Sequence, residues 1–188
     1  MARSGVDSTD PAGRPLAGPD PGAVLTAAFD SARDELLSTL MYVVGDREMA
    51  QDAAQDAFIK CWRNRHQVFE VDNLRAWIFR VAMNAAKDLR RSAWHRKSRA
   101  FSGEEFSLPG RDGPTDEAID NQDALERIRR AIFDLRPEER EIFLLRQNAD
   151  LTFEDIADMR GVPIGTVKTQ MRAALAKLKK VLTKEDTN

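Results

Sequence analysis

The sequence predicts an all-α protein: two small helical domains joined by a flexible acidic linker, the second containing a helix-turn-helix. Glycine and proline, which interrupt helices, are nearly absent from two long stretches and concentrate before and between them. Within those stretches the apolar residues recur near the 3.6-residue period of an α-helix. A short helix, a glycine-containing turn and a longer basic helix follow one another near the C-terminal end.

The helix-breaking residues divide the 188-residue chain into five segments. Residues 1–22 hold four of the ten glycines and four of the eight prolines, with almost no bulky apolar residue, which predicts a disordered tail. Residues 23–100 contain one glycine and no proline. The expected segments are the tail at 1–22, a first domain at 23–100, an acidic linker at 101–117, a second domain at 118–182 and a C-terminal tail at 183–188.

We expect three helices in the first domain. The first ends at Gly45-Asp46, and a break near 67–72 separates the second from the third, which Asp72 or Asn73 caps. The apolar stripe of the first helix is Leu25, Phe29, Leu36, Leu40 and Val44. That of the second is Ala50, Ala54, Ala57, Phe58 and Cys61. That of the third is Leu74, Trp77, Ile78, Val81, Ala85 and Leu89.

We expect four helices in the second domain. The first spans about 118–134, and the second starts at Pro137, a residue favoured at the first helical position. The third starts at Thr152, with Asp155 placed for a capping box, and ends at Gly161. The fourth runs from about Pro163 to Leu182. Its expected buried stripe is Val167, Met171, Ala174, Leu175, Leu178 and Leu182.

Charge is strongly segregated, although the net charge is only −2. Residues 60–99 carry eleven basic and three acidic side chains, a net charge of +8, whereas residues 101–126 carry one basic and eight acidic side chains. Residues 160–180 hold six basic residues and no acidic one. Two basic blocks separated by an acidic one predict two anion-binding surfaces, although a basic run can also simply solvate a helix face.

The composition argues against several classes of protein. A single cysteine, Cys61, excludes an intramolecular disulfide and a cysteine-rich zinc site. There is no glycine-rich phosphate loop and no histidine pair at ligand spacing, so we expect no enzyme, no metal site and no cofactor. No apolar run approaches the ~18 residues of a membrane span, and the start lacks a secretory signal. We therefore expect a cytoplasmic protein without membrane insertion.

Two constellations of residues point to nucleic acid. The helix-turn-helix spacing of residues 152–182 places Thr166, Lys168, Thr169 and Arg172 on an outer face that suits a major groove, although a solvated αα-hairpin has the same pattern. In residues 60–99, aromatic side chains interleave with basic ones, as in single-strand binding surfaces. Trp77 fits the core stripe, whereas Phe69 and Trp94 lie outside the regular stripes and are candidates for exposure.

Three stretches resemble the extracytoplasmic-function (ECF) sigma factors, small two-domain initiation subunits of bacterial RNA polymerase. Residues 52–62 (DAAQDAFIKCW) resemble the polymerase-binding helix of sigma region 2, and residues 73–84 (NLRAWIFRVAMN) resemble its promoter-melting helix. Region 4 is matched by residues 135–143 (LRPEEREIF), 151–157 (LTFEDIA) and 161–168 (GVPIGTVK). The resemblance covers about residues 23–182.

The resemblance implies a role for each candidate residue. Asp52, Gln55 and Asp56 would dock on the clamp coiled coil of core RNA polymerase. Phe69 and Asn84 would line one pocket that captures a flipped base of the −10 promoter element. Other −10 contacts would come from Arg80, Lys87, Arg90 and Arg91. The −35 element would be read by Thr166, Lys168, Thr169 and Arg172.

The chain departs from the family pattern at Gln170 and Ala173, where many members carry arginine. We therefore expect the −35 contacts to depend more on Lys168 and Arg172. The family further implies an anti-sigma factor as partner and a nucleoid location within the holoenzyme. Two other functions remain open from the residues alone: a stand-alone helix-turn-helix regulator that binds duplex DNA without polymerase, and an RNA-binding adaptor. The acidic residues Asp52 and Asp56 favour the sigma factor over the regulator, which has no need of them.

Overall fold

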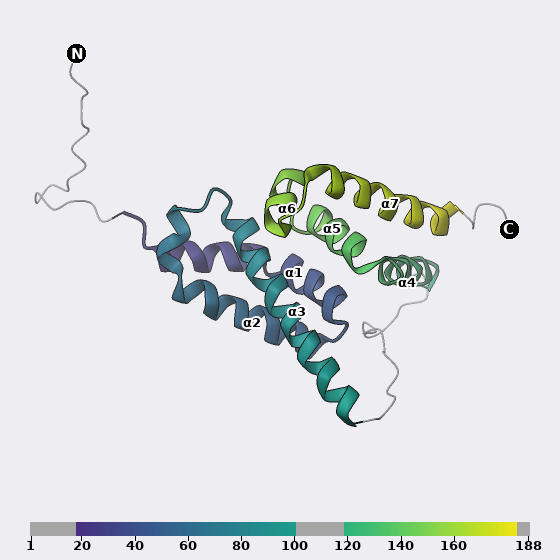
Figure 1. Ribbon diagram of the computed structural model, residues 1–188, viewed down its shortest axis with the longest axis horizontal. Coiled ribbons are helices and arrows are strands. Elements are labelled where there is room, and N and C mark those ends of the chain that lie inside the picture. The colour runs from purple at the N-terminus through teal and green to yellow at the C-terminus, as the bar shows by residue number, and fades with distance from the viewer. Residues whose placement is uncertain (1–17, 101–118, 184–188) are drawn as a thin grey trace, which may run out of the picture.

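The computed structural model describes residues 18–100 and 119–183, and every element within these ranges is helical. The all-α prediction is therefore confirmed (Figure 1). The elements are α1 (Pro21–Val44), α2 (Arg47–Arg63), the 3-10 helix η1 (Arg65–Phe69), α3 (Leu74–Ala100), α4 (Ile119–Phe133), α5 (Pro137–Gln147), α6 (Phe153–Arg160) and α7 (Ile164–Thr183). None of these helices combines the length and apolar character needed to cross a membrane.

The first body consists of α1, α2, η1 and α3, packed together through their apolar faces. Gly45 ends α1 in a left-handed conformation with φ of 77°, and the Asp46 carboxylate caps α2 by accepting a hydrogen bond from the Met49 N–H. Asn73 caps α3, because its side-chain oxygen accepts from the Ala76 N–H at 3.0 Å. Of the two predicted caps the structure therefore selects Asn73. The short helix η1, which was not predicted, overlaps the start of the break expected near 67–72.

The second body consists of α4 to α7, and its helix boundaries follow the predicted caps. Pro137 occupies the first turn of α5. Thr152 and Asp155 form the expected capping box of α6, with the Thr152 hydroxyl accepting from the Asp155 N–H at 3.0 Å and Asp155 accepting from the Thr152 N–H at 2.9 Å. Gly161 ends α6 in a left-handed conformation. Helices α6 and α7 thus form the predicted helix-turn-helix.

Two details of the prediction are wrong. Leu175, expected in the buried stripe of α7, is 46% exposed, because it lies to one side of the buried row formed by Val167, Met171, Ala174 and Leu178. The tail predicted at 1–22 extends too far, since Asp20 caps α1 and Gly22 is buried against the Trp62 ring. The rest of that tail (1–17), the acidic linker at 101–117 and residues 184–188 of the C-terminal tail lie outside the described residues.

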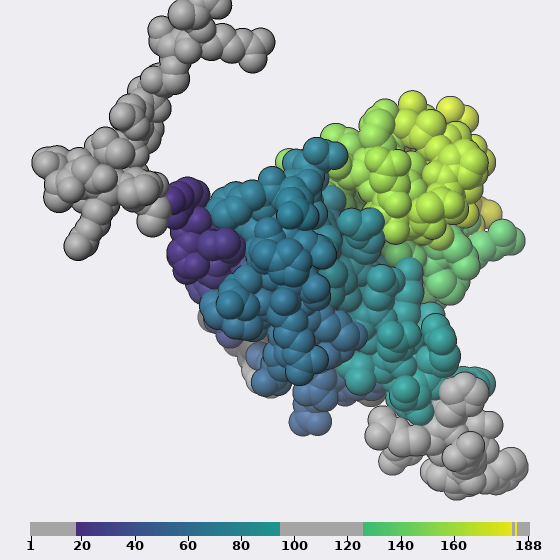
Figure 2. All heavy atoms as spheres, turned by 60° about the vertical axis from the view of Figure 1, so that its left-hand side comes forward, coloured from purple at the N-terminus to yellow at the C-terminus, as the bar shows by residue number. Residues whose placement is uncertain are grey.

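The two bodies pack directly against each other, which the sequence reasoning did not anticipate (Figure 2). Helix α5 contacts α1, and α6 contacts α3. Buried side chains of both bodies form one cluster, including Leu36, Leu40, Ile78, Ile142, Leu145 and Ile156. Hydrogen bonds also join the two sides of this interbody interface. The residues of the first body are Thr39, Tyr42, Asn73, Arg75 and Lys87, and those of the second body are Arg140, Glu141, Asn148, Ala149 and Asp155.

The turn of the helix-turn-helix provides a stability test. Gly161 has φ of 64°, a conformation that costs a residue with a Cβ about 1–2 kcal/mol. We expect Gly161→Ala to lower the free energy of unfolding by about that amount. At Gly165, the second residue of α7, an added Cβ meets no atom within 4 Å, so Gly165→Ala should raise the free energy of unfolding by about 0.4–1 kcal/mol. Urea denaturation monitored by circular dichroism measures both free energies of unfolding. Changes of the same sign in the two variants would contradict the left-handed turn at Gly161.

Candidate nucleic-acid interface

The acidic residues predicted to dock on polymerase share one face of α2. Asp52 and Gln55 are exposed and Asp56 is partly exposed, at helical spacings of three and four. Asp56 forms an ion pair with Lys60 at 2.7 Å, but both side chains are 45% exposed. Such a surface pair holds the carboxylate only weakly, so it remains available to a partner. We call Asp52, Gln55 and Asp56 the α2 face.

An apolar residue beside these acids escaped the sequence reasoning. Ile59 is 41% exposed and lies one turn beyond Gln55 on the same side of α2. Buried apolar anchors ringed by polar groups contribute much of the energy at protein interfaces. The i, i+4 spacing from Gln55 was the signal available in the sequence.

A row of polar residues runs along one side of α3. Arg80, Asn84 and Arg91 are exposed and Lys87 is half-buried. Their spacings of four, three and four residues place them on a single helical face. We call Arg80, Asn84, Lys87 and Arg91 the α3 stripe. It unites four of the residues that the resemblance assigned to the −10 element.

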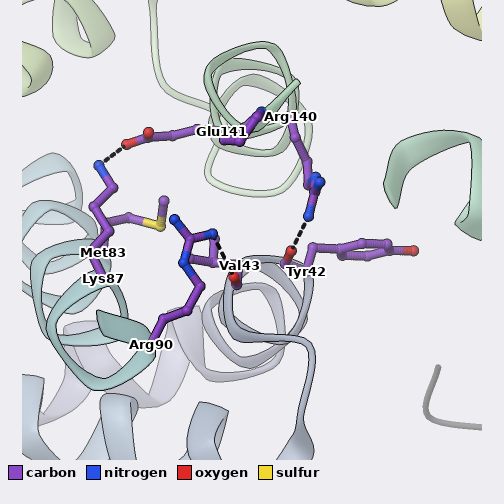
Figure 3. A pocket seen from close by; sticks show the side chains of 8 residues that line it. Tyr42, Val43, Met83, Lys87, Arg90, Arg140 and Glu141 are labelled. Carbon is purple, nitrogen blue, oxygen red and sulfur yellow. Dashed lines mark hydrogen bonds and ion pairs between the residues drawn. The ribbon is translucent and has the colours of Figure 1, made fainter. Parts of the chain in front are cut away.

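Arg90, the remaining basic residue assigned to this element, lies off the stripe. Its guanidinium donates a hydrogen bond at 3.3 Å to the Val43 backbone carbonyl at the end of α1. It lines a small pocket between the bodies, together with Lys87 and Arg140 (Figure 3). In this structure the exposed Arg90 side chain joins α3 to α1, and its assignment to the −10 element stays a prediction.

The aromatic candidates are exposed as expected. Phe69, at the end of η1, is 56% exposed and Trp94, on α3, is 73% exposed, whereas Trp77 is buried. Asn84 lies ten residues into α3, about 15 Å along the axis from the start of the helix. Whether Phe69 and Asn84 line one pocket stays a prediction.

The outer face of α7 carries the residues expected to read duplex DNA. Thr166, Lys168, Thr169 and Arg172 are all exposed, while Val167 and Met171 anchor the opposite face. The Thr169 hydroxyl donates to the Gly165 carbonyl at 2.9 Å and keeps its acceptor lone pairs. The four side chains therefore form one polar surface, which we call the α7 face.

The two positions that depart from the family pattern are partly buried. The Gln170 side-chain oxygen accepts a hydrogen bond at 2.8 Å from Arg160 of α6, and Ala173 is half-buried beside the α7 face. Arg160 is itself only 13% exposed and lies 3.8 Å from the Glu141 carboxylate. The oxygen of Gln170 is thus held inside the second body, which leaves its amide N–H groups for other contacts.

The titratable groups serve packing and capping. Cys61 is buried, and burial raises the pKa of its thiol to about 12. Burial acts to raise the pKa of Glu139, but hydrogen bonds from Lys177 and the Arg136 N–H outweigh burial and hold the pKa below its ordinary value. Among the described residues no cluster of His, Cys, Asp and Glu could hold a metal ion.

Comparison with known proteins identifies the two bodies. The family model for sigma-70 region 2 matches residues 28–96, and that for sigma-70 region 4 matches residues 125–178. The chain is 31% identical over 134 residues to the ECF RNA polymerase sigma factor RpoE of Cereibacter sphaeroides, covering 69% of this chain and 70% of that protein. It is 25% identical over 157 residues to the RNA polymerase sigma factor YlaC of Bacillus subtilis, covering 80% and 87%.

Solved structures share the fold. The sigma factor RpoE from Bartonella quintana, in complex with the anti-sigma factor NepR, superposes with a TM-score of 0.66 at 22% identity, over 87% of this chain and 96% of that one. CnrH, in complex with the cytosolic domain of CnrY, gives a TM-score of 0.57 at 20% identity, over 88% and 99%. Two sigma regions in one chain argue against a stand-alone helix-turn-helix regulator. The chain belongs to the ECF sigma factors, which direct RNA polymerase to promoters.

Proposed function

We propose that this sigma factor divides its work among three surfaces: the α2 face docks on core RNA polymerase, the α3 stripe with Phe69 engages the −10 element, and the α7 face reads the −35 element. The observation that supports this division is that the three sets reach solvent on different helices: α2, η1 with α3, and α7. Each set carries the charge that its partner requires, acidic toward the polymerase and basic toward DNA.

The domains, location and further partner follow from the same proposal. The promoter-melting domain is residues 20–100, the −35 domain is 118–182, and the acidic segment 101–117 links them. The chain acts in the cytoplasm as a non-catalytic subunit, bound to the nucleoid when in holoenzyme. That the Bartonella relative was solved with an anti-sigma factor supports an anti-sigma partner for this chain as well.

Reversing the charge of the α2 face tests polymerase docking. We expect the Asp52→Lys, Asp56→Lys double variant to weaken binding to core polymerase by at least about tenfold, because like charges across an interface cost several kcal/mol. The matched control is Asp30→Lys, Asp34→Lys, which reverses two exposed acids at the same spacing on α1. Fluorescence anisotropy with labelled sigma factor measures both affinities. Equal losses in the two double variants would contradict the docking assignment.

Promoter opening tests the −10 residues. Phe69→Ala and Asn84→Ala should bind core polymerase and form closed complexes but leave −10 thymines unreactive to permanganate. The reason is that base–aromatic stacking, worth about 1–3 kcal/mol, is comparable to the cost of flipping one base. On a pre-melted template Phe69→Ala should recover in part, while Asn84→Ala should stay defective in base choice.

The control for the aromatic ring is Phe69→Tyr, which keeps the stacking surface and should open the promoter normally. If both alanine variants showed wild-type permanganate reactivity, Phe69 and Asn84 would have no role in promoter opening.

Two basic residues of α7 separate base reading from phosphate binding. Arg172→Ala should cost about 1–3 kcal/mol of −35 affinity and relax preference at one base pair, as expected for a lost base contact. Lys179→Ala should weaken binding to all sequences and lower the salt slope by about one unit. Binding to a panel of −35 duplexes at several salt concentrations measures both effects. Sequence-independent losses from both variants would assign Arg172 to phosphate.

A further inference from the structure

Trp94, on α3, is the most exposed large apolar side chain among the described residues, and it belongs to none of the three proposed surfaces. Its side chain is 73% exposed, whereas Trp62 is 40% exposed and Trp77 is buried. Single exposed apolar side chains are common on protein surfaces. The position of the ring on α3 and the chemistry of its neighbours therefore decide what it can bind.

The Trp94 ring is free of the contacts that hold the other exposed tryptophan. The Trp62 ring stacks on Phe58, with ring centroids 5.8 Å apart, and the Arg65 guanidinium lies 5.1 Å from its centroid. Among the described residues, no ring pair and no cation–π contact involves Trp94. The C-terminal part of α3 projects beyond α1 and α2 (Figure 1). The indole can therefore receive a planar group without displacing another ring or a guanidinium.

Trp94 continues the line of the α3 stripe. It lies three residues after Arg91, so the spacings from Arg80 to Trp94 are four, three, four and three residues. Successive residues of an α-helix are rotated by about 100°, which places these five positions within about 80° of one another around the axis. The polar stripe therefore ends in an aromatic ring on the same side of α3.

The charges around the ring fit a polyanion. Arg90 and Arg91 precede Trp94 by four and three residues, so they lie one turn before it on either side, and both are exposed. The α3 stripe itself holds three basic residues and no acidic one. Proteins bind single-stranded nucleic acid with cations along the backbone and aromatic rings against the bases. The stripe and Trp94 together supply both kinds of group.

We propose that Trp94 is a further promoter-binding residue, a platform on which one unpaired base stacks at the end of the α3 stripe. This inference rests on the proposed function of the stripe. Trp94 lies ten residues beyond Asn84, which is about 15 Å along the helix axis. Bases of one strand follow each other at about 3.4 Å. The base on Trp94 is therefore about four nucleotides from the base that Asn84 contacts.

Fluorescent aminopurine bases in the DNA test this contact, because their fluorescence falls when an aromatic ring stacks on them. The full chain with core polymerase is bound to pre-melted templates that carry aminopurine at successive positions of either strand. Trp94→Leu keeps an apolar side chain but removes the ring. We expect this variant to raise the fluorescence at one position and to weaken template binding by about tenfold. The matched control, Trp94→Phe, keeps a stacking ring and should stay close to wild type.

The position of the affected base is a second readout. Asn84→Ala should change the fluorescence at a different position, about four nucleotides from the one that responds to Trp94→Leu. Unchanged fluorescence in Trp94→Leu at every position, or a response at the same base as Asn84→Ala, would overturn the proposal. A loss of affinity for core polymerase without any change at the DNA would assign the ring to the polymerase and also overturn it.

The two variants separate this inference from the function on which it rests. A response to Asn84→Ala without a response to Trp94→Leu would overturn the role of Trp94 and leave the α3 stripe as the −10 surface. If neither variant changed the fluorescence at any position, the proposed function of the stripe would itself be contradicted.

Discussion

Helix α3 is the element on which the rest of the structure depends, because it serves three neighbours at once. One face packs through Trp77, Ile78 and Ala82 into the core shared with α1 and α2. Its N-terminal end holds the second body through Asn73 and Arg75. A third face carries the α3 stripe. Successive side chains of an α-helix are about 100° apart around the helix axis. Residues a few positions apart can therefore lie on different faces and contact different partners.

The contacts within the first body differ in chemistry from the contacts between the two bodies. Within the first body the helices meet through fully buried side chains such as Ile78 and Phe79, whose exposure to water would be costly. Between the bodies, apolar contacts are accompanied by hydrogen bonds to backbone carbonyls and by the Lys87–Glu141 pair. Interfaces of this mixed kind resemble transient protein–protein contacts.

The glutamine at position 170, a departure from the family pattern, has a physical explanation in the second body. Gln170 is tied to Arg160, and Arg160 lies against Glu141, so a polar chain leads from the α7 face to the interbody interface. An arginine at position 170 would place a second cation beside Arg160, whereas glutamine supplies the acceptor that Arg160 needs. Gln170 thus fits its neighbours in this chain.

The sequence by itself determined the local features: the helix boundaries, the caps at Thr152 and Asp155, the left-handed turn at Gly161 and the exposure of Phe69 and Trp94. These depend on residues close in the chain, whose periodicity and backbone preferences can be read directly. Only the tertiary structure decided that Arg90 contacts α1, that Leu175 is exposed and that Glu141 forms an ion pair with Lys87. Those outcomes depend on how whole helices pack, since Lys87 and Glu141 are 54 residues apart and nothing local links them.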